Sequence, residues 1–325
     1  MEYNKIKGLE KPISRFVLGT MTFREPDKFD EYFAMLDDAL ANGINTIDSA
    51  RGYGRGNSER AIVQWMKERG NRDQIVFTTK GCHHSFRDRC HDFDISVDLI
   101  DSLCRTGLDY VDIFYMHRDD PKVPVKEIID NLNWHIQEGR IKAIGVANWQ
   151  IERVREANEY AEANGLVGIS VIEEHYSIAE QLADPFNKGS GTLSGPKYAE
   201  QRKWVAENHM PVTSYSTLSG GFVTGRITRE LLAENPDAIE EGVRRAYCHE
   251  VNFKRLDRTA ELAAYKGISI PQVGLAYAMS GEMDVYPIIG AANAAEMKSS
   301  LETLNMRLTK AECDWIDCTS DEKPF

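Results

Sequence analysis

Short apolar runs alternate with longer stretches of helical periodicity from about residue 16 to residue 305. Eight of these runs are short and rich in apolar residues, as expected of strands that are buried on both faces of a parallel sheet. The predicted strands are Phe16–Leu18, Ile44–Ile47, Ile75–Thr79, Val111–Tyr115, Ile141–Val146, Ile169–Ile172, Val212–Tyr215 and Val285–Ile288.

The stretches between these strands space apolar residues three or four positions apart, which is typical of helices that bury one face. Asn42-Gly43 and Asn164-Gly165 are typical helix ends, and Asn57 or Ser58 could cap a helix start. The predicted helices are Asp30–Ala41, Asn57–Lys67, Ile95–Arg105, Val125–Gln137, Ile151–Ala163, Pro196–Glu207, Phe253–Tyr265, Pro271–Met279 and Ala294–Leu304.

Eight strands that alternate with helices favour an α/β fold, a (β/α)₈ TIM barrel formed as a single domain over residues 1–325. A doubly wound open sheet is the alternative, but a dinucleotide-binding sheet of that kind should show GxGxxG after its first strand, and the sequence lacks it. Ala183–Gly195 and the stretch from Ser216 to about Glu250 are predicted to be long loops after late strands.

Composition narrows the classes of partner. The chain has 325 residues, of which 42% are hydrophobic, so it can form a large core. Its net charge is −12, so it lacks the excess of basic residues that is typical of proteins binding nucleic acids or anionic membranes. It has no apolar run of about 20 residues and no signal-peptide core at its start, so we expect a cytoplasmic location. Six cysteines without a CxxC pair predict free thiols and no metal site.

Ionisable residues follow three successive predicted strands. Asp48, Lys80 and His117 are each the first polar group after an apolar run, and Tyr53 follows Asp48 in a loop flanked by glycines. Strand ends of this kind converge in a barrel. A nearby ammonium would lower the pKa of a phenol, a carboxylate would hold the ammonium, and a neutral imidazole could orient a carbonyl. Each residue alone has an ordinary structural explanation, but together they predict an acid–base site.

These residues belong to motifs that extend over essentially the whole chain. They are Gly19-Thr-Met-Thr-Phe23, Gly43–Gly54 followed by Ser58-Glu59, Thr78-Thr-Lys80, Leu108–His117, Gly139–Trp149 and Ile288-Ile-Gly-Ala291. With them the chain resembles the aldo-keto reductases. That resemblance implies a barrel, a nicotinamide cofactor bound without a Rossmann fold, and a catalytic tetrad of Asp48, Tyr53, Lys80 and His117. It also implies that hydride passes between nicotinamide C4 and a carbonyl or alcohol carbon while Tyr53 exchanges the proton.

The resemblance further implies cofactor contacts. Asn148 would bind the carboxamide, Tyr215 would stack on the nicotinamide, and the loop from Ser216 to Gly220 would bind the pyrophosphate. The implied cofactor residues are Thr20, Met21, Asp48, Asn148, Glu173, Tyr215, Ser216, Thr217, Leu218, Gly220, Gly290, Ala291 and Ala292. Phe23, His83 and Trp149 would line the substrate pocket.

Two parts of the predicted cofactor site depart from the family pattern. Glu173 stands where many members have a glutamine that binds the carboxamide. Glu296, Ser299 and Ser300 stand where the last helix usually supplies an arginine for the 2′-phosphate of NADP and a pair of residues for adenine. NADP(H) is the cofactor implied by the family. Glu296 would repel its 2′-phosphate, and NAD(H), which lacks that phosphate, is therefore expected to be usable as well.

A small carbonyl or alcohol substrate is expected, and the mixed aromatic and polar pocket suits a sugar, polyol or hydroxy-ketone. Two other functions are considered. A non-catalytic, nicotinamide-binding regulatory barrel is disfavoured by the intact tetrad. A metal-dependent hydrolase or isomerase would use His83, His84, His117, Glu173, Glu174 and His175, but these residues lack a recognisable ligand spacing and Lys80 would compete with the metal.

Overall fold

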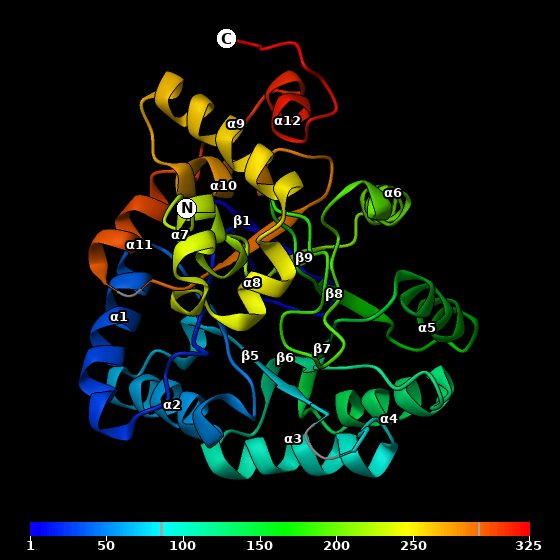
Figure 1. Ribbon diagram of the computed structural model, residues 1–325. Helices are drawn as coiled ribbons and strands as arrows, with labels where there is room; N and C mark the ends of the chain where they lie inside the picture. Colours follow the sequence, from blue (N-terminus) through cyan, green and yellow to red (C-terminus); the bar gives the residue numbers. More distant parts are fainter. Residues whose placement is uncertain (85–86, 292) are drawn as a thin grey trace. The chain divides into compact units, whose positions relative to one another are not determined.

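A computed structural model describes residues 1–84, 87–291 and 293–325. Eight strands form a closed barrel in the order β10-β3-β4-β5-β6-β7-β8-β9, which confirms the predicted fold (Figure 1). Every predicted strand overlaps one of them. Their bounds are β3 Val17–Gly19, β4 Thr46–Asp48, β5 Val76–Gly81, β6 Val111–Met116, β7 Ile141–Ala147, β8 Ile169–Glu173, β9 Val212–Ser214 and β10 Val285–Ile289. The sequence analysis missed a short hairpin before the barrel, β1 (Tyr3–Asn4) and β2 (Ile13–Ser14).

The helices also follow the predicted pattern, with the largest differences late in the chain. Their bounds are α1 Phe29–Ala41, α2 Asn57–Arg69, α3 Asp92–Thr106, α4 Val125–Gln137, α5 Ile151–Ala163, α6 Ala199–Glu207, α7 Arg229–Glu234, α8 Glu241–Tyr247, α9 Glu250–Lys266, α10 Ile270–Ala278, α11 Ala294–Leu301 and α12 Lys310–Ile316. The predicted loop from Ser216 to about Glu250 is wrong in part, because it contains α7 and α8. The stretch Ala183–Gly195 forms no helix or strand, as predicted.

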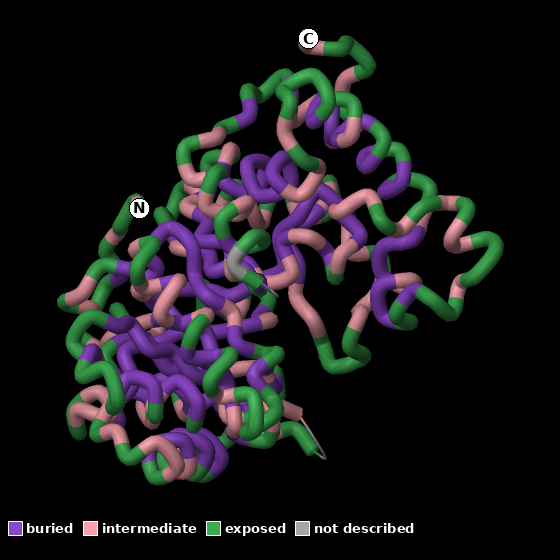
Figure 2. Tube along the Cα trace, turned by 90° about the vertical axis from the view of Figure 1, so that its left-hand side faces the viewer, coloured by how far each residue is buried: buried purple, intermediate pink, exposed green. Residues whose placement is uncertain are grey.

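The chain divides into two compact units. Unit 1 comprises Met1–Glu173 with Gly290–Ala294, and unit 2 comprises Glu174–Ile289 with Ala295–Phe325. In unit 1, α3 packs on β5 and β6, α4 on β7 and α5 on β8. All residues of β4, β5, β6 and β8 are buried, and Figure 2 shows buried segments of the chain in purple. Burial on both faces explains why these strands are rich in apolar residues.

The parallel register of unit 1 brings its polar strand ends to one edge of the sheet. Asp48 pairs with Thr78 between β4 and β5, and Lys80 pairs with Tyr115 between β5 and β6. On β8, Glu173 pairs with Ala147 of β7. Three ionisable side chains therefore lie at the carboxyl ends of their strands, where barrel enzymes carry their chemistry.

In unit 2, β9 and β10 form a parallel pair, and α10 begins with a capping box between Ser269 and Gln272. No helix in the described part of the chain is long and apolar enough to cross a membrane.

Candidate active site

Lys80 is the centre of a buried charge cluster in unit 1. Its ammonium forms an ion pair with Asp48, donates to the backbone oxygen of Ser49 at 3.0 Å, and lies 3.3 Å from Glu173 Oε2. Thr78 Oγ1 also donates to Asp48 at 3.2 Å. Burial acts to lower the pKa of Lys80, but the charges of Asp48 and Glu173 outweigh it and raise that pKa. The side chain is therefore a permanent cation.

Tyr53 lies in a sharp turn after β4. Its backbone N–H donates to Ala50 O at 3.0 Å, and Gly54, Arg55 and Gly56 all have positive φ angles. A side chain at Gly54 would bring a Cβ within 2.6 Å of Phe23 O, so the turn requires glycine there. The predicted cap at Asn57 or Ser58 is wrong, because Gly56 precedes the helix and no side chain caps it.

This turn places the Tyr53 phenol beside Lys80 and His117. Lys80 Nζ lies 5.2 Å from the Tyr53 ring centroid, and the rings of Tyr53 and His117 are 6.0 Å apart at 82°. Part of the Tyr53 side chain is exposed to solvent, but the surrounding protein desolvates the phenol and raises its pKa. The positive charge of Lys80 lowers the pKa but offsets only part of this increase. The expected net lowering of this pKa is therefore not found, and the phenol holds its proton at neutral pH.

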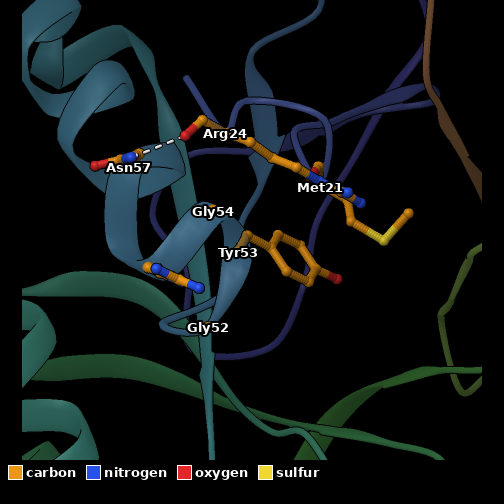
Figure 3. A pocket seen from close by; sticks show the side chains of 7 residues that line it. Met21, Arg24, Gly52, Tyr53, Gly54 and Asn57 are labelled. Atoms are coloured by element: carbon orange, nitrogen blue, oxygen red, sulfur yellow. Dashed lines mark hydrogen bonds between the residues drawn. The ribbon is translucent and has the colours of Figure 1, made fainter. Parts of the chain in front are cut away.

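An open pocket of about 540 Å³ borders Tyr53 (Figure 3). Its walls come from the segment after β3 and from the Tyr53 turn. Figure 3 shows the Tyr53 ring projecting from its turn beside Met21, while Asn57 Nδ2 donates to Arg24 O at 2.8 Å. The lining residues are Met21, Arg24, Gly52, Tyr53, Gly54, Arg55 and Asn57. Sequence reasoning missed Arg24, Arg55 and Asn57, although all three lie within motif segments or directly beside them.

His117 follows β6 and is only partly exposed. Burial, helped by the charges of Arg118 and Lys80, lowers its pKa well below the usual range, so the imidazole is neutral at pH 7. The His83 ring lies 4.7 Å from the His117 ring. Asn148, which has a φ of 63°, donates from Nδ2 to His117 O at 3.2 Å. A neutral ring in this position can donate to a carbonyl oxygen, and it can donate to or accept from a hydroxyl group.

The remaining predicted residues of unit 1 differ in their exposure. Thr20 is buried and donates to Asp48 O at 2.7 Å, whereas Met21 is exposed in the pocket. Phe23 is fully buried and stacks on Tyr32, so it supports the pocket from within the core and does not line it. Trp149 is also buried, with Arg153 over its ring. Gly290 is exposed and Ala291 buried, while Ala292 lies outside the described residues.

In unit 2, the predicted pyrophosphate loop has a backbone suited to an anion. Ser219, Gly220 and Gly221 have successive positive φ values of 52°, 61° and 92°, and Ser216 before them has 48°. Left-handed runs of this kind turn neighbouring N–H groups toward one concave side, where anions bind. Thr217 is buried and donates to Ser214 O, and Leu218 contributes a half-buried side chain. At the start of this loop, Tyr215 is half-buried and donates to Gly191 O at 2.9 Å.

The buried imidazole of His175 connects this loop to the loop before α6. Its Nδ1 lies 2.9 Å from Thr192 Oγ1, and its Nε2 lies 3.4 Å from Ser219 Oγ. Ser219 Oγ in turn donates to Ser177 Oγ at 2.8 Å. Both ring nitrogens of His175 thus face hydroxyl groups, and its function as an anchor between two loops was not predicted.

His175 should make the folded state sensitive to acid. Burial lowers its pKa to about 3, whereas the unfolded chain binds that proton near pH 6.5. Below pH 6.5 the unfolded state therefore holds more protons, and stability falls as the pH falls. Replacing His175 with glutamine should reduce the loss of unfolding free energy between pH 6.5 and 5 by about 2 kcal/mol. Urea unfolding at both pH values measures the change in unfolding free energy, and replacement of the exposed His209 with glutamine is the control. If the pH dependence of stability in His175→Gln equals that of wild type, the prediction is contradicted.

A model of the aldo/keto reductase family matches residues 15–320. The chain belongs to this family. It is 28% identical over 318 residues to an aldo-keto reductase of Emericella nidulans, covering 91% of this chain and 73% of that protein. It is 27% identical to a norsolorinic acid reductase of Aspergillus flavus, covering 96% and 78%. The fold is similar to that of a glycerol dehydrogenase from Gluconobacter oxydans, with a TM-score of 0.74 at 22% identity, covering 99% and 98% of the two chains.

Membership of the aldo/keto reductase family identifies the chain as an NAD(P)-dependent oxidoreductase in general terms. The described residues contain no group of three or more His, Cys, Asp or Glu side chains that could hold a metal.

Proposed function

We propose that this aldo/keto reductase interconverts a small carbonyl compound and its alcohol, with Tyr53 as the general acid in reduction and the general base in oxidation. The observation that supports the assignment most strongly is the buried Lys80 ammonium, which is paired with Asp48 and lies 5.2 Å from the Tyr53 ring. A bound nicotinamide would supply or accept the hydride. The protein groups would handle the proton and the developing charge on the substrate oxygen.

In reduction, Tyr53 donates its proton to the carbonyl oxygen as negative charge develops there. Lys80 stabilises the phenolate that remains, and Asp48 holds the ammonium in place. The neutral imidazole of His117 donates to the same oxygen and orients it. In oxidation, the phenolate form of Tyr53, which Lys80 stabilises, accepts the hydroxyl proton, and His117 orients the hydroxyl group.

The chemistry of the chain fits a nicotinamide dinucleotide. The left-handed run Ser219–Gly221 suits a pyrophosphate, and the ring of Tyr215 offers an aromatic face. Asn148 would hold the carboxamide together with Glu173. On the substrate side, Arg24, Arg55 and Asn57 make the pocket polar, which supports a hydroxylated substrate such as a sugar, polyol or hydroxy-ketone.

Cofactor titration followed by turnover tests this function. NADPH or NADH should quench the tryptophan fluorescence without added metal, and aldehydes, ketones and sugars should then be reduced. Binding without any turnover across such a panel would support the regulatory barrel instead. Failure of both cofactors to bind would contradict the proposal as a whole.

The two cofactors should bind with similar affinity. Glu296 lies in the first turn of α11 and is exposed, at the position where the family usually has an arginine for the 2′-phosphate. We expect Glu296→Gln to tighten NADP(H) binding more than NAD(H) binding, since it removes a like charge, by roughly 5-fold for about 1 kcal/mol. Fluorescence titrations measure both dissociation constants, with the exposed Glu282→Gln as control. A wild-type preference for NADPH above about 100-fold, or about 2.7 kcal/mol, would contradict this expectation.

A further inference from the structure

Glu173 brings a second buried carboxylate to the catalytic ammonium. It ends β8, is only 3% exposed, and its Oε2 lies 3.3 Å from Lys80 Nζ. Asp48 forms the closer ion pair with the same nitrogen. One ammonium therefore faces two buried carboxyl groups, and Asp48 is the closer of the two.

The charges around Glu173 favour a proton on this residue. Lys80 on β5 is the cation that faces it, while Asp48 on β4 carries a like charge and Tyr53 contributes an uncharged phenol. His117, whose charge Lys80 disfavours, is neutral. Two ionised carboxylates and one ammonium would leave a net negative charge buried in the protein, which is costly. Burial and Asp48 together raise the pKa of Glu173 to about 8, although Lys80 opposes them.

We infer that Glu173 carries a proton in the resting enzyme and releases it when an oxidised nicotinamide is bound. This inference rests on the proposed function, because it places a nicotinamide next to Glu173. A neutral carboxylic acid has one donor and one acceptor, as does the glutamine amide usual at this position, so it can bind a carboxamide as that amide does. A carboxylate instead stabilises the positive ring of an oxidised nicotinamide.

Charge and protons balance through the reaction. In reduction, hydride goes to the substrate carbon, Tyr53 gives its proton to the substrate oxygen, and the Glu173 proton replaces it on Tyr53 by way of the Lys80 ammonium. The ionised Glu173 would then offset the positive charge of an oxidised nicotinamide, so the total charge of the site would be unchanged. Glu173 takes a proton from solvent when the oxidised cofactor leaves.

Infrared spectroscopy of the cofactor-free protein tests the resting proton without any catalysis. The difference spectrum, wild type minus Glu173→Gln, should show the carbonyl stretch of a protonated carboxylic acid at pH 6. This band should disappear by pH 10. The equally buried neighbour Glu174→Gln should leave the band in place. The inference is overturned if wild type lacks the band, or if the band is lost in Glu174→Gln rather than in Glu173→Gln. Either result counts whether or not the protein proves to be a carbonyl reductase.

Cofactor binding tests the release step. Below pH 8, the dissociation constant for oxidised cofactor should fall about 10-fold per pH unit as the pH rises, while that for reduced cofactor should stay constant. Calorimetry in buffers of different ionisation enthalpy should show one proton released per oxidised cofactor bound to wild type and none for Glu173→Gln. Equal proton release by both proteins overturns the inference. If no cofactor binds, the proposed function fails, while the infrared band can still be present.

Discussion

Replacing Tyr53 with phenylalanine is expected to lower kcat for carbonyl reduction by roughly 10²–10⁴-fold, the usual contribution of a general acid. The reason is specific to the hydroxyl, since phenylalanine preserves the ring beside Lys80 and His117. Cofactor affinity should change little, because the proposed cofactor contacts lie elsewhere. Steady-state kinetics with the best substrate of the panel, together with fluorescence titration of the cofactor, measures both effects.

Tyr32→Phe is a matched control for this experiment. Its hydroxyl lies 3.3 Å from the backbone nitrogens of Arg24 and Glu25, so it is near the pocket but belongs to the surrounding structure. The control should retain kcat within a small factor. If Tyr53→Phe retains activity and Tyr32→Phe loses it, the proton donor has been assigned wrongly. If both variants lose activity together with cofactor binding, the effect is one of folding.

The barrel could be predicted because its strands are buried on both faces. Short runs rich in apolar residues, such as Val111–Tyr115, have few interpretations, and the predicted helices Val125–Gln137 and Ile151–Ala163 match α4 and α5 in both bounds. Unit 2 was harder to predict. The short helices α7 and α8 lie in a segment of mixed composition where apolar periodicity extends over fewer than two full turns.

The proximity of the catalytic groups could also be predicted, since parallel strands bring their carboxyl ends together. The balance of charge within the cluster could not. Glu173 was expected to contact the cofactor, whereas its place beside Lys80 depends on the register of β8, which the apolar pattern of Ile169–Ile172 does not specify. The pKa of Tyr53 was misjudged for a related reason: burial is a property of the packed structure, and it outweighs the effect of Lys80.

Replacing Lys80 with methionine should both abolish activity and destabilise unit 1. Two buried carboxylates would lose their common cation, and removal of one partner of a buried ion pair usually costs about 3–5 kcal/mol. The loss should be greatest near pH 8 and smaller near pH 5, because acid protonates the abandoned carboxylates and removes their charge. Urea unfolding across this range measures the effect, with the exposed Lys126→Met as control.

The double variant Lys80→Met/Glu173→Gln separates the charge effect from lost packing. Without Glu173, folding at pH 8 no longer requires a proton on a buried carboxyl group that is ionised in the unfolded chain. The double variant should therefore regain part of the lost stability at pH 8 and show a weaker pH dependence than Lys80→Met. Activity should not return, because Tyr53 still lacks the cation that stabilises its phenolate. Equal stability of the single and double variants at every pH would mean that burial does not raise the pKa of Glu173 once Lys80 is absent, and that Asp48 alone accounts for the pH dependence of Lys80→Met.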